Sequence, residues 1–225
     1  MIGWAILATL QASALVVVDA GHGGSDPGAS GYGLLEKEIN LETVLDLVDL
    51  LEADTADGTG GWAWDVHATR TSDVTVSLAA RVEFANAIGA DRFLSIHTNA
   101  FTDPAAQGIE TYSYQEGTVA AQLRDQIHME AVAHWPLVDR GVKTASFYVL
   151  KYTAMPAELH ELGFVTSPVD SQYLGNSEEL LEAASAHLHG LQSHYGAAPF
   201  DPQEDGGPGG GAETGILTGL IYDAS

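Results

Sequence analysis

Four residues with metal-binding or acid–base side chains fall where a parallel sheet would bring them together. His22 and His97 each stand at the end of a short apolar run of strand type. Glu161 ends a third such run, and Glu36 begins a helical pattern that could fold back toward His22. Because the site of an open parallel sheet forms at the carboxyl ends of its strands, the four residues could share one edge. Two imidazoles and a carboxylate would there suit a zinc ion, with a second carboxylate to spare.

Each of these residues also has a simpler structural role. A histidine after a strand is more often a hydrogen-bonded loop residue than a metal ligand. Glu36 would interact favourably with a helix dipole as a first-turn acid. Glu161 could be one charge at a crowded sheet edge, next to Glu158 and His160. Since the four residues are dispersed and no H-E-x-x-H segment is present, the pattern by itself leaves a zinc site and no metal site both open.

The glycine-rich segment 19–28, which carries His22, raises two further possibilities, and both fail on spacing. A dinucleotide-binding G-x-G-x-x-G turn would need a third glycine where Asp26 stands, and no G-K-[ST] of a P-loop follows. A nucleophile elbow G-x-S-x-G around Ser25 would need a glycine where Pro27 stands. The segment therefore predicts neither a phosphate cradle nor a serine hydrolase.

The hydrophobic pattern alternates between strand type and helix type along the chain. The predicted strands are 15–19, 64–69, 92–96, 108–114, 147–150 and 157–162. The predicted helices are 37–51, 77–88, 119–133 and 178–194. This alternation predicts a single α/β domain, with a mostly parallel twisted sheet of about six strands and helices on both faces.

The segments on either side of the predicted domain, residues 15–196, differ from it in composition. Residues 1–14 form an apolar run that ends in Ala-Ser-Ala, as a signal-peptidase site would, but no Lys or Arg precedes it. A cleaved leader and an ordinary N-terminal strand or helix both stay open. Residues 197–225 begin as a linker rich in Gly, Pro and acidic residues and end in an apolar tail. That tail either docks on the domain or begins a further, incomplete module.

The composition excludes several classes of partner and chemistry. Only 8 Lys and Arg stand against 31 Asp and Glu, which gives a formal net charge of −23. Such a chain repels nucleic acids and anionic membrane surfaces, so we expect neither as a partner. The absence of cysteine excludes a thiol nucleophile, a cysteine zinc site and any disulfide. No segment approaches the about 20 apolar residues of a membrane span.

Seven sequence blocks occur in an order that is characteristic of one enzyme family. They are VVVDAGHGGSDPGA, LLEKEINL, TRTSDVTVSLAARVEFAN, FLSIHTNA, GIETY, RGVKTASFYVL and MPAELHELGFVTSPVD. Together they resemble the Amidase_3 family of zinc-dependent N-acetylmuramoyl-L-alanine amidases, and the resemblance covers about residues 15–195.

The resemblance implies that His22, Glu36 and His97 are zinc ligands. It also implies that Glu161, which precedes Leu-Gly-Phe, is the catalytic carboxylate. Glu38 is the alternative to Glu36 as the third ligand, and the match to the family's motif favours Glu36.

Two further residues with titratable side chains lie close to Glu161 in the sequence. Glu158 is the alternative to Glu161, and the match to the family's E-x-G-F pattern favours Glu161. His160 could interact with Glu161 or point to the other face of the sheet, and strand alternation favours the second arrangement.

The implied activity is hydrolysis of peptidoglycan at the amide between the lactyl group of N-acetylmuramic acid and L-alanine of the stem peptide. The implied mechanism is attack by a zinc-activated water, with Glu161 as general base and then general acid. A zinc peptidase that cuts within the stem peptide and a non-catalytic wall-binding module are the alternatives.

The resemblance also implies the biological setting of a secreted wall hydrolase. We expect a monomer in the cell envelope, periplasmic or extracellular, with peptidoglycan as its partner. Some members carry a long insert that covers the zinc until an activator protein removes it. Here residues 115–118 leave no room for such an insert, so we expect no activator to be required.

Overall fold

The computed structural model describes residues 12–57 and 62–200 of the chain. Residues 12–14, at the end of the predicted leader, belong to the first strand. The rest of that segment and almost all of the predicted C-terminal linker and tail lie outside the described residues, so their roles remain predictions.

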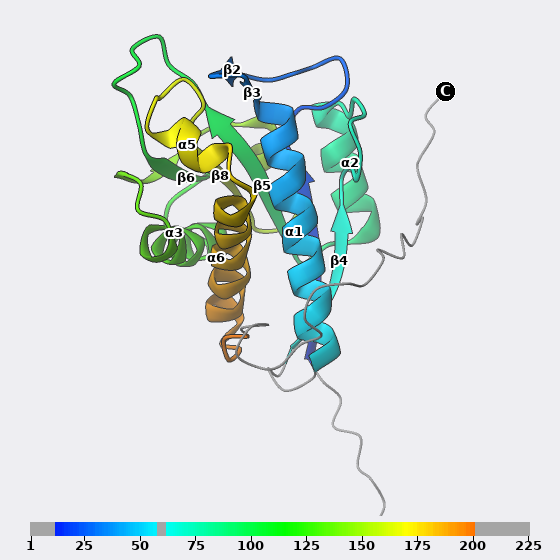
Figure 1. The fold of residues 1–225 in the computed structure, drawn as a ribbon. Helices are drawn as coiled ribbons and strands as arrows, with labels where there is room; N and C mark the ends of the chain where they lie inside the picture. Colours follow the sequence, from blue (N-terminus) through cyan, green and yellow to red (C-terminus); the bar gives the residue numbers. More distant parts are fainter. Residues whose placement is uncertain (1–11, 58–61, 201–225) are drawn as a thin grey trace, which may run out of the picture.

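A six-stranded sheet forms the centre of the molecule (Figure 1), and its strand order is β4-β1-β5-β8-β6-β7. Four strands, β4, β1, β5 and β8, run parallel, whereas β6 is antiparallel to β8 and β7 is parallel to β6. The strands are β1 (Ala12–Ala20), β4 (Trp62–Ala68), β5 (Arg92–Asn99), β6 (Ile109–Ser113), β7 (Asp139–Thr144) and β8 (Ala157–Phe164). The predicted α/β fold with a mostly parallel sheet of six strands is confirmed.

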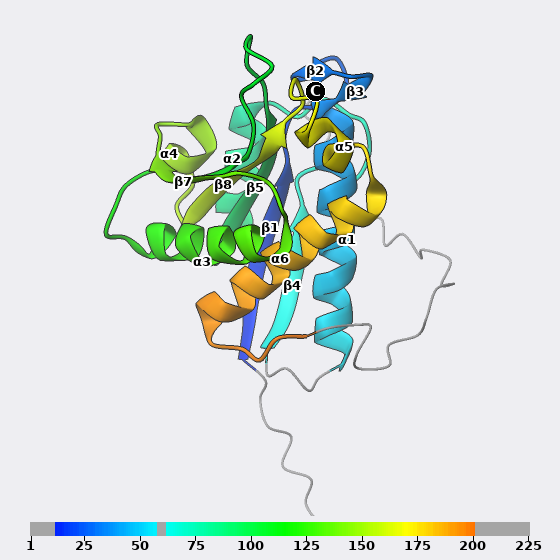
Figure 2. The ribbon, with the colours of Figure 1, turned by 60° about the vertical axis from the view of Figure 1, so that its left-hand side comes forward.

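Helices cover both faces of this sheet, as predicted (Figure 2). One face packs against α1 (Glu36–Asp57), α3 (Val119–His134) and α6 (Ser177–Tyr195), and the other against α2 (Leu78–Ile88) and α4 (Tyr148–Tyr152). Successive residues of β1 alternate between the two layers, with Val16 and Val18 in one buried cluster and Val17 in the other. This explains the uninterrupted apolar run, because a strand covered on both faces needs apolar side chains at every position.

Smaller elements complete the fold near the carboxyl ends of the central strands. The short helix α5 (Asp170–Leu174) follows β8, and β2 (Ser30–Gly31) pairs with β3 (Leu34–Leu35) in a separate small hairpin. No helix among the described residues is long and apolar enough to cross a membrane.

The prediction was wrong at one strand and missed another. Residues 147–150 are not a strand: most of them belong to α4, which buries Val149 and Leu150. A run of four apolar residues does not distinguish a strand from one helical turn. The sixth strand is instead β7, which lies at the sheet edge and has no fully buried residue. Its sequence, DRGVKT, lacks an apolar run because an edge strand needs none.

The strand directions decide which residues can meet at the edge of the sheet that is formed by the carboxyl ends of its central strands. Strands β1, β5 and β8 end at one edge of the sheet, and the antiparallel β6 begins there. His97 and Glu161 are register partners on adjacent strands, and Glu110 at the start of β6 is the partner of Glu161 on its other side. His22 follows β1 by two residues. The fold thus gathers the predicted site at this edge.

Helices α3 and α6 pack closely enough that a glycine is required at their contact. A Cβ added at Gly190 of α6 would lie 2.6 Å from the Cα atom of Ile127 in α3. Real Cβ atoms do not approach backbone that closely, so a side chain at position 190 would force the helices apart.

We predict that Gly190→Ala lowers the free energy of unfolding by about 1–3 kcal/mol through overpacking. At an uncrowded helix position the same change would raise it by about 1 kcal/mol, because alanine has the higher helix propensity. Urea denaturation measures the difference. Glu182→Ala, at an exposed position of α6, is the control and should stay within about 0.5 kcal/mol. A stabilised Gly190→Ala variant would show that the contact is not tight.

Candidate metal centre and active site

The loop after β1 is held in place by two buried arginines. Arg81 of α2 forms an ion pair with Asp19 and donates to the carbonyl oxygens of Ala20 and His22, both at 2.6 Å. Arg70 donates to the carbonyl oxygens of Ala20 and Gly21, both at 2.9 Å. The backbone of the loop therefore points its carbonyl groups at cationic donors.

His22 is presented by an uncommon backbone conformation. Its φ angle is 61°, in the left-handed region that few residues other than glycine adopt. The hydrogen bond from Arg81 to its carbonyl oxygen holds this conformation. The neighbouring Gly21 leaves room for the His97 ring, since a Cβ there would lie 2.3 Å from its Cε1 atom. The glycines of this loop thus allow two histidine rings to approach each other.

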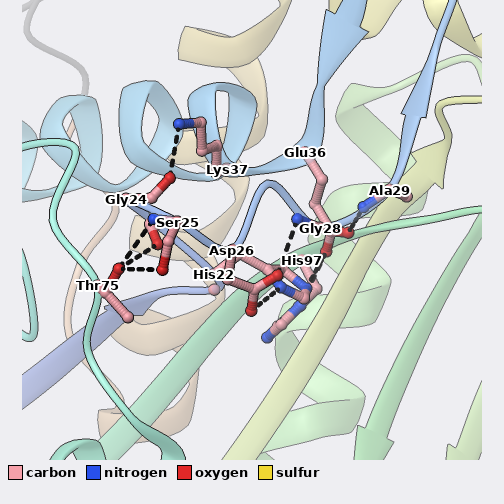
Figure 3. Close-up of polar contacts among 12 residues, drawn as sticks. His22, Gly24, Ser25, Asp26, Gly28, Ala29, Glu36, Lys37, Thr75 and His97 are labelled. Atoms are coloured by element: carbon pink, nitrogen blue, oxygen red, sulfur yellow. Dashed lines mark hydrogen bonds and ion pairs between the residues drawn. The ribbon is translucent and has the colours of Figure 1, made fainter.

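The side chains of His22, Glu36 and His97 converge on one point (Figure 3). Oε1 of Glu36 lies 3.1 Å from Nε2 of His22 and 2.9 Å from Nδ1 of His97. The two imidazole rings stand edge to face with centroids 5.1 Å apart. One donor atom from each of the three residues lies within 4.8 Å of the others.

Glu36 is the buried centre of this cluster, at the first position of α1. Its Oε2 atom accepts from the backbone N–H of Ala29 at 2.7 Å, and its Oε1 atom accepts from that of Thr98 at 3.1 Å. Burial alone would raise the pKa of Glu36, but the hydrogen bonds to His22 and His97 outweigh it and hold that pKa well below its ordinary value. Glu36 is therefore an anion at neutral pH.

The hydrogen-bond pattern around His22 calls for a cation between its ring and Glu36. Nδ1 of His22 lies 2.8 Å from Oδ2 of Asp26, whose pKa is lowered by this contact, so the carboxylate accepts and Nδ1 carries the proton. The lone pair of Nε2 then faces the Glu36 carboxylate unless a proton or a metal ion lies between them. In the metal-free protein a proton on Nε2 lies between the ring and the carboxylate, because the hydrogen bond to Glu36 raises the pKa of His22 to about 9.

The donor set fits zinc. Two imidazole nitrogens and one carboxylate oxygen are a common zinc ligand set that keeps a position open. Asp26 fixes the tautomer of His22 by accepting a hydrogen bond from Nδ1, as carboxylates do for histidine ligands in zinc sites. Since a metal ion would displace the proton of His22, binding should weaken as the pH falls.

Glu161 lies beside this cluster without joining the three converging residues. It is the register partner of His97, yet it is not among the three residues whose donor atoms lie within 4.8 Å of one another. Its Oε2 atom is buried and has no hydrogen-bond partner among the described residues. Burial raises the pKa of Glu161 to about 7; nearby His97 opposes the rise, and Glu36 adds to it. A carboxylate with a pKa near neutrality is suited to exchange protons.

The structure separates the predicted residues from their alternatives. Glu38 is exposed on α1, away from the buried position of Glu36. Glu158 is fully buried, and in residues 12–57 and 62–200 neither of its carboxylate oxygens has a hydrogen-bond partner. His160 lies between Thr111, whose hydroxyl is 3.0 Å from its Nδ1 atom, and the ring of His187 in α6. His160 therefore faces the helices, as strand alternation predicts.

Glu110 and its basic partners lie within the sequence blocks, but the sequence did not predict a role for them. Glu110, the partner of Glu161 in register, is bound by Arg140, by Tyr112 and by Lys143, the last at 2.7 Å. These residues line an open cleft of about 570 Å³ at the same edge of the sheet. The signal was available: Arg140 and Lys143 are two of only 8 basic residues in the whole chain.

The comparison with protein families decides the identity of the domain. Residues 16–193 match the Amidase_3 model, described as N-acetylmuramoyl-L-alanine amidase. The chain belongs to the Amidase_3 family. By family it is an N-acetylmuramoyl-L-alanine amidase, and the resemblance inferred from the sequence blocks is confirmed.

Characterised relatives and solved structures agree with this assignment. The amidase CwlM of Bacillus licheniformis is 43% identical over 177 residues, which are 78% of this chain and 66% of that protein. The sporulation-specific amidase of Bacillus subtilis is 39% identical over 181 residues, 80% of this chain and 68% of that protein. The amidase AmiC2 of Nostoc punctiforme superposes with a TM-score of 0.74 at 33% identity, over 81% of this chain and 97% of that one.

The raised pKa of Glu161 predicts a pH-dependent stability in the metal-free Amidase_3 domain. Its pKa rises from 4.5 to about 7 on folding. Folding therefore favours the neutral form, and this contribution is full below pH 4.5 and lost as the pH rises through 7. We predict that Glu161→Gln, which stays neutral, gains about 2–3 kcal/mol relative to the wild type between about pH 4.5 and pH 8.

Urea denaturation in the presence of a chelator measures this difference. Glu38→Gln is the matched control, because it removes an exposed carboxylate at the start of α1. Its free energy of unfolding should stay within about 0.5 kcal/mol of the wild type. A pH-independent difference for Glu161→Gln would contradict the raised pKa.

Proposed function

We propose that this amidase is zinc-dependent and hydrolyses peptidoglycan at the amide between the lactyl group of N-acetylmuramic acid and L-alanine of the stem peptide. The observation that carries the proposal is the convergence of His22, Glu36 and His97 beside a second, separate carboxylate, Glu161. Hydrolysis of an amide needs an activated water and a group that moves its proton, and these four residues provide for both.

In the proposed site, His22, Glu36 and His97 hold the zinc ion. When bound, zinc supplies Lewis acidity, which polarises a carbonyl group and lowers the pKa of water to about 7. Asp26 keeps the His22 ring in the tautomer that presents Nε2, and the backbone N–H groups of Ala29 and Thr98 orient Glu36.

Glu161 moves the proton in the proposed reaction. Its carboxylate accepts a proton from the attacking water and delivers it to the leaving amine of L-alanine. Since burial raises its pKa to about 7, both the charged and the neutral form are accessible at neutral pH. A carboxylate that bound the metal tightly could not serve in this way.

The cleft beside Glu161 is the proposed location of the substrate. Arg140 and Lys143 line it and bind Glu110, whose pKa stays low because their hydrogen bonds and that of Tyr112 outweigh its burial. Two cations at this position offer hydrogen bonds to an anionic group of a ligand in a chain that is otherwise strongly acidic.

We also propose that the enzyme acts in the cell envelope as a monomer and without an activator protein. Its substrate is a component of the envelope. The link from β6 to α3 consists of residues 114–118 only, which supports an uncovered site.

Digestion of purified peptidoglycan, followed by mass spectrometry of the fragments, tests this function. An amidase releases intact stem peptides that begin with L-alanine, and a chelator should stop their release. Shortened stem peptides would indicate the alternative, a peptidase. Binding without any released fragment would indicate a wall-binding module. No activity until another protein is added would contradict the uncovered site.

We predict that Glu161→Gln lowers the amidase rate by about 10²–10⁴-fold while the bound zinc is unchanged, because the amide cannot take up the proton of water. Initial rates on purified peptidoglycan and elemental analysis of the same samples measure both quantities. Glu38→Gln should retain the wild-type rate, since its side chain is exposed. A Glu161→Gln enzyme with near-wild-type turnover would exclude the assigned role.

We predict that His97→Ala removes one zinc ion per chain and abolishes amidase activity. Losing a direct ligand should weaken binding by more than the about 10- to 100-fold that loss of an outer-shell partner costs. Elemental analysis after dialysis against a zinc buffer measures the metal content. His67→Ala, a largely exposed histidine of β4, is the matched control and should keep both zinc and activity. Unchanged zinc content in His97→Ala would refute the ligand assignment.

A further inference from the structure

A second group of potential metal ligands lies where α3 and α6 pack together. Glu130 and His134 occupy successive turns of α3, and His189 projects from α6. One donor atom from each residue lies within 4.8 Å of the others. Their rings and carboxylate are partly buried, and none of the three belongs to the candidate active site.

The close contact of the two helices creates this cluster. His189 is adjacent to Gly190, the residue that lets α6 approach the backbone of α3 at Ile127. Glu130 lies three residues beyond Ile127 and His134 follows one turn later, so both line the same side of the contact. The rings of His134 and His189 have centroids 5.1 Å apart.

The hydrogen bonds of the two rings fix which nitrogen atoms carry protons. Nδ1 of His134 lies 2.9 Å from the carbonyl oxygen of Glu130, and Nε2 of His189 lies 3.2 Å from that of Phe200. A carbonyl oxygen only accepts, so each of these nitrogens must donate. In the neutral rings the other two nitrogens, Nε2 of His134 and Nδ1 of His189, therefore carry lone pairs.

Those two lone pairs face each other. Nε2 of His134 and Nδ1 of His189 are 3.2 Å apart, a distance at which two acceptors repel unless a cation lies between them. The Glu130 carboxylate adds negative charge beside them, and its Oε1 atom accepts from the hydroxyl of Ser193 at 3.4 Å. Histidine ligands of metal ions are commonly oriented in this way, by donating the other ring N–H to a backbone carbonyl oxygen.

We propose that Glu130, His134 and His189 bind a divalent transition-metal ion, for which Zn²⁺ is the natural probe, and that this ion fastens α3 to α6. Two imidazoles and one carboxylate are a ligand set of borderline hardness, suited to zinc rather than to Mg²⁺ or Ca²⁺. The side chains of Glu130 and His134 remain 22% and 25% exposed, so water can complete the coordination. The site is separate from the proposed active site and has a structural role.

The test counts zinc ions bound to the full-length chain after chelator treatment and equilibrium dialysis against a zinc buffer. The wild type should bind two ions, and His189→Ala and His134→Ala should each bind one. His97→Ala should also bind one, and the double variant His97→Ala/His189→Ala should bind none. His67→Ala, which removes a histidine outside both clusters, should still bind two.

Unfolding temperature provides a second readout that activity does not influence. Zinc should raise the unfolding temperature of His97→Ala, because the ion binds only the folded pair of helices, and it should not raise that of the double variant. Because His97→Ala leaves α3 and α6 intact, it tests the site even if substitutions at the helix contact impair folding.

The outcomes separate this site from the active site. The wild type could bind a single ion that is lost in His189→Ala but kept in His97→Ala. That result would support the site between the helices and would contradict a zinc-dependent active site. If His97→Ala binds no zinc and gains no thermal stability from it, the helix site is overturned, and a shared proton between the two rings is what relieves their repulsion.

Discussion

The buried ion pair between Asp19 and Arg81 is the interaction on which the geometry of the candidate active site depends. Both side chains are almost inaccessible to solvent. Burial would raise the pKa of Asp19, yet the charge of Arg81 and hydrogen bonds from Thr69 and Arg81 lower it, so the pair is ionised. Taking two charges out of water is costly, and further hydrogen bonds must offset that cost. Here Ser95 also donates to Asp19, at 2.8 Å.

The arginine of this pair also shapes the loop that carries the first histidine. Its guanidinium group spans from β1 to the carbonyl oxygen of His22, whose backbone adopts a conformation that few residues other than glycine adopt. Hydrogen bonds thus join the ion pair, the loop and β5 into one connected unit. A site built on such a unit is preorganised, because its ligand side chains need not move far to meet.

A shared electrostatic feature links this centre with the cluster between α3 and α6. At each location, two atoms that can only accept hydrogen bonds lie about as far apart as a donor and its acceptor. A hydrogen bond from the other nitrogen of the histidine ring fixes its tautomer. Each arrangement therefore requires a cation. One arrangement lies at the carboxyl ends of the central strands, and the other lies where α3 and α6 approach each other closely at Gly190.

The sequence predicted the sheet because the signals of its strands are local, whereas the four candidate residues were assigned through the resemblance to the Amidase_3 family. The predicted strand 15–19 is buried apart from the half-buried Leu15, His97 and Glu161 lie in the second halves of β5 and β8, and His22 lies two residues beyond β1. The edge strand β7 was not predicted, since it has no buried apolar run. The role of Glu110 and the helix cluster also escaped prediction. Both depend on contacts between residues far apart in the chain, which periodicity does not reveal.

In the proposed active site, one zinc ion binds His22, Glu36 and His97 while Glu161 stays free to move protons. Anomalous diffraction at the zinc absorption edge, from crystals of the zinc-loaded enzyme, tests this arrangement most directly, because it locates each ion among its ligands. We expect an anomalous peak in contact with both imidazoles and the Glu36 carboxylate, with Glu161 outside bonding distance. A peak bonded to Glu161 in place of Glu36, or no peak at this edge of the sheet, would contradict it.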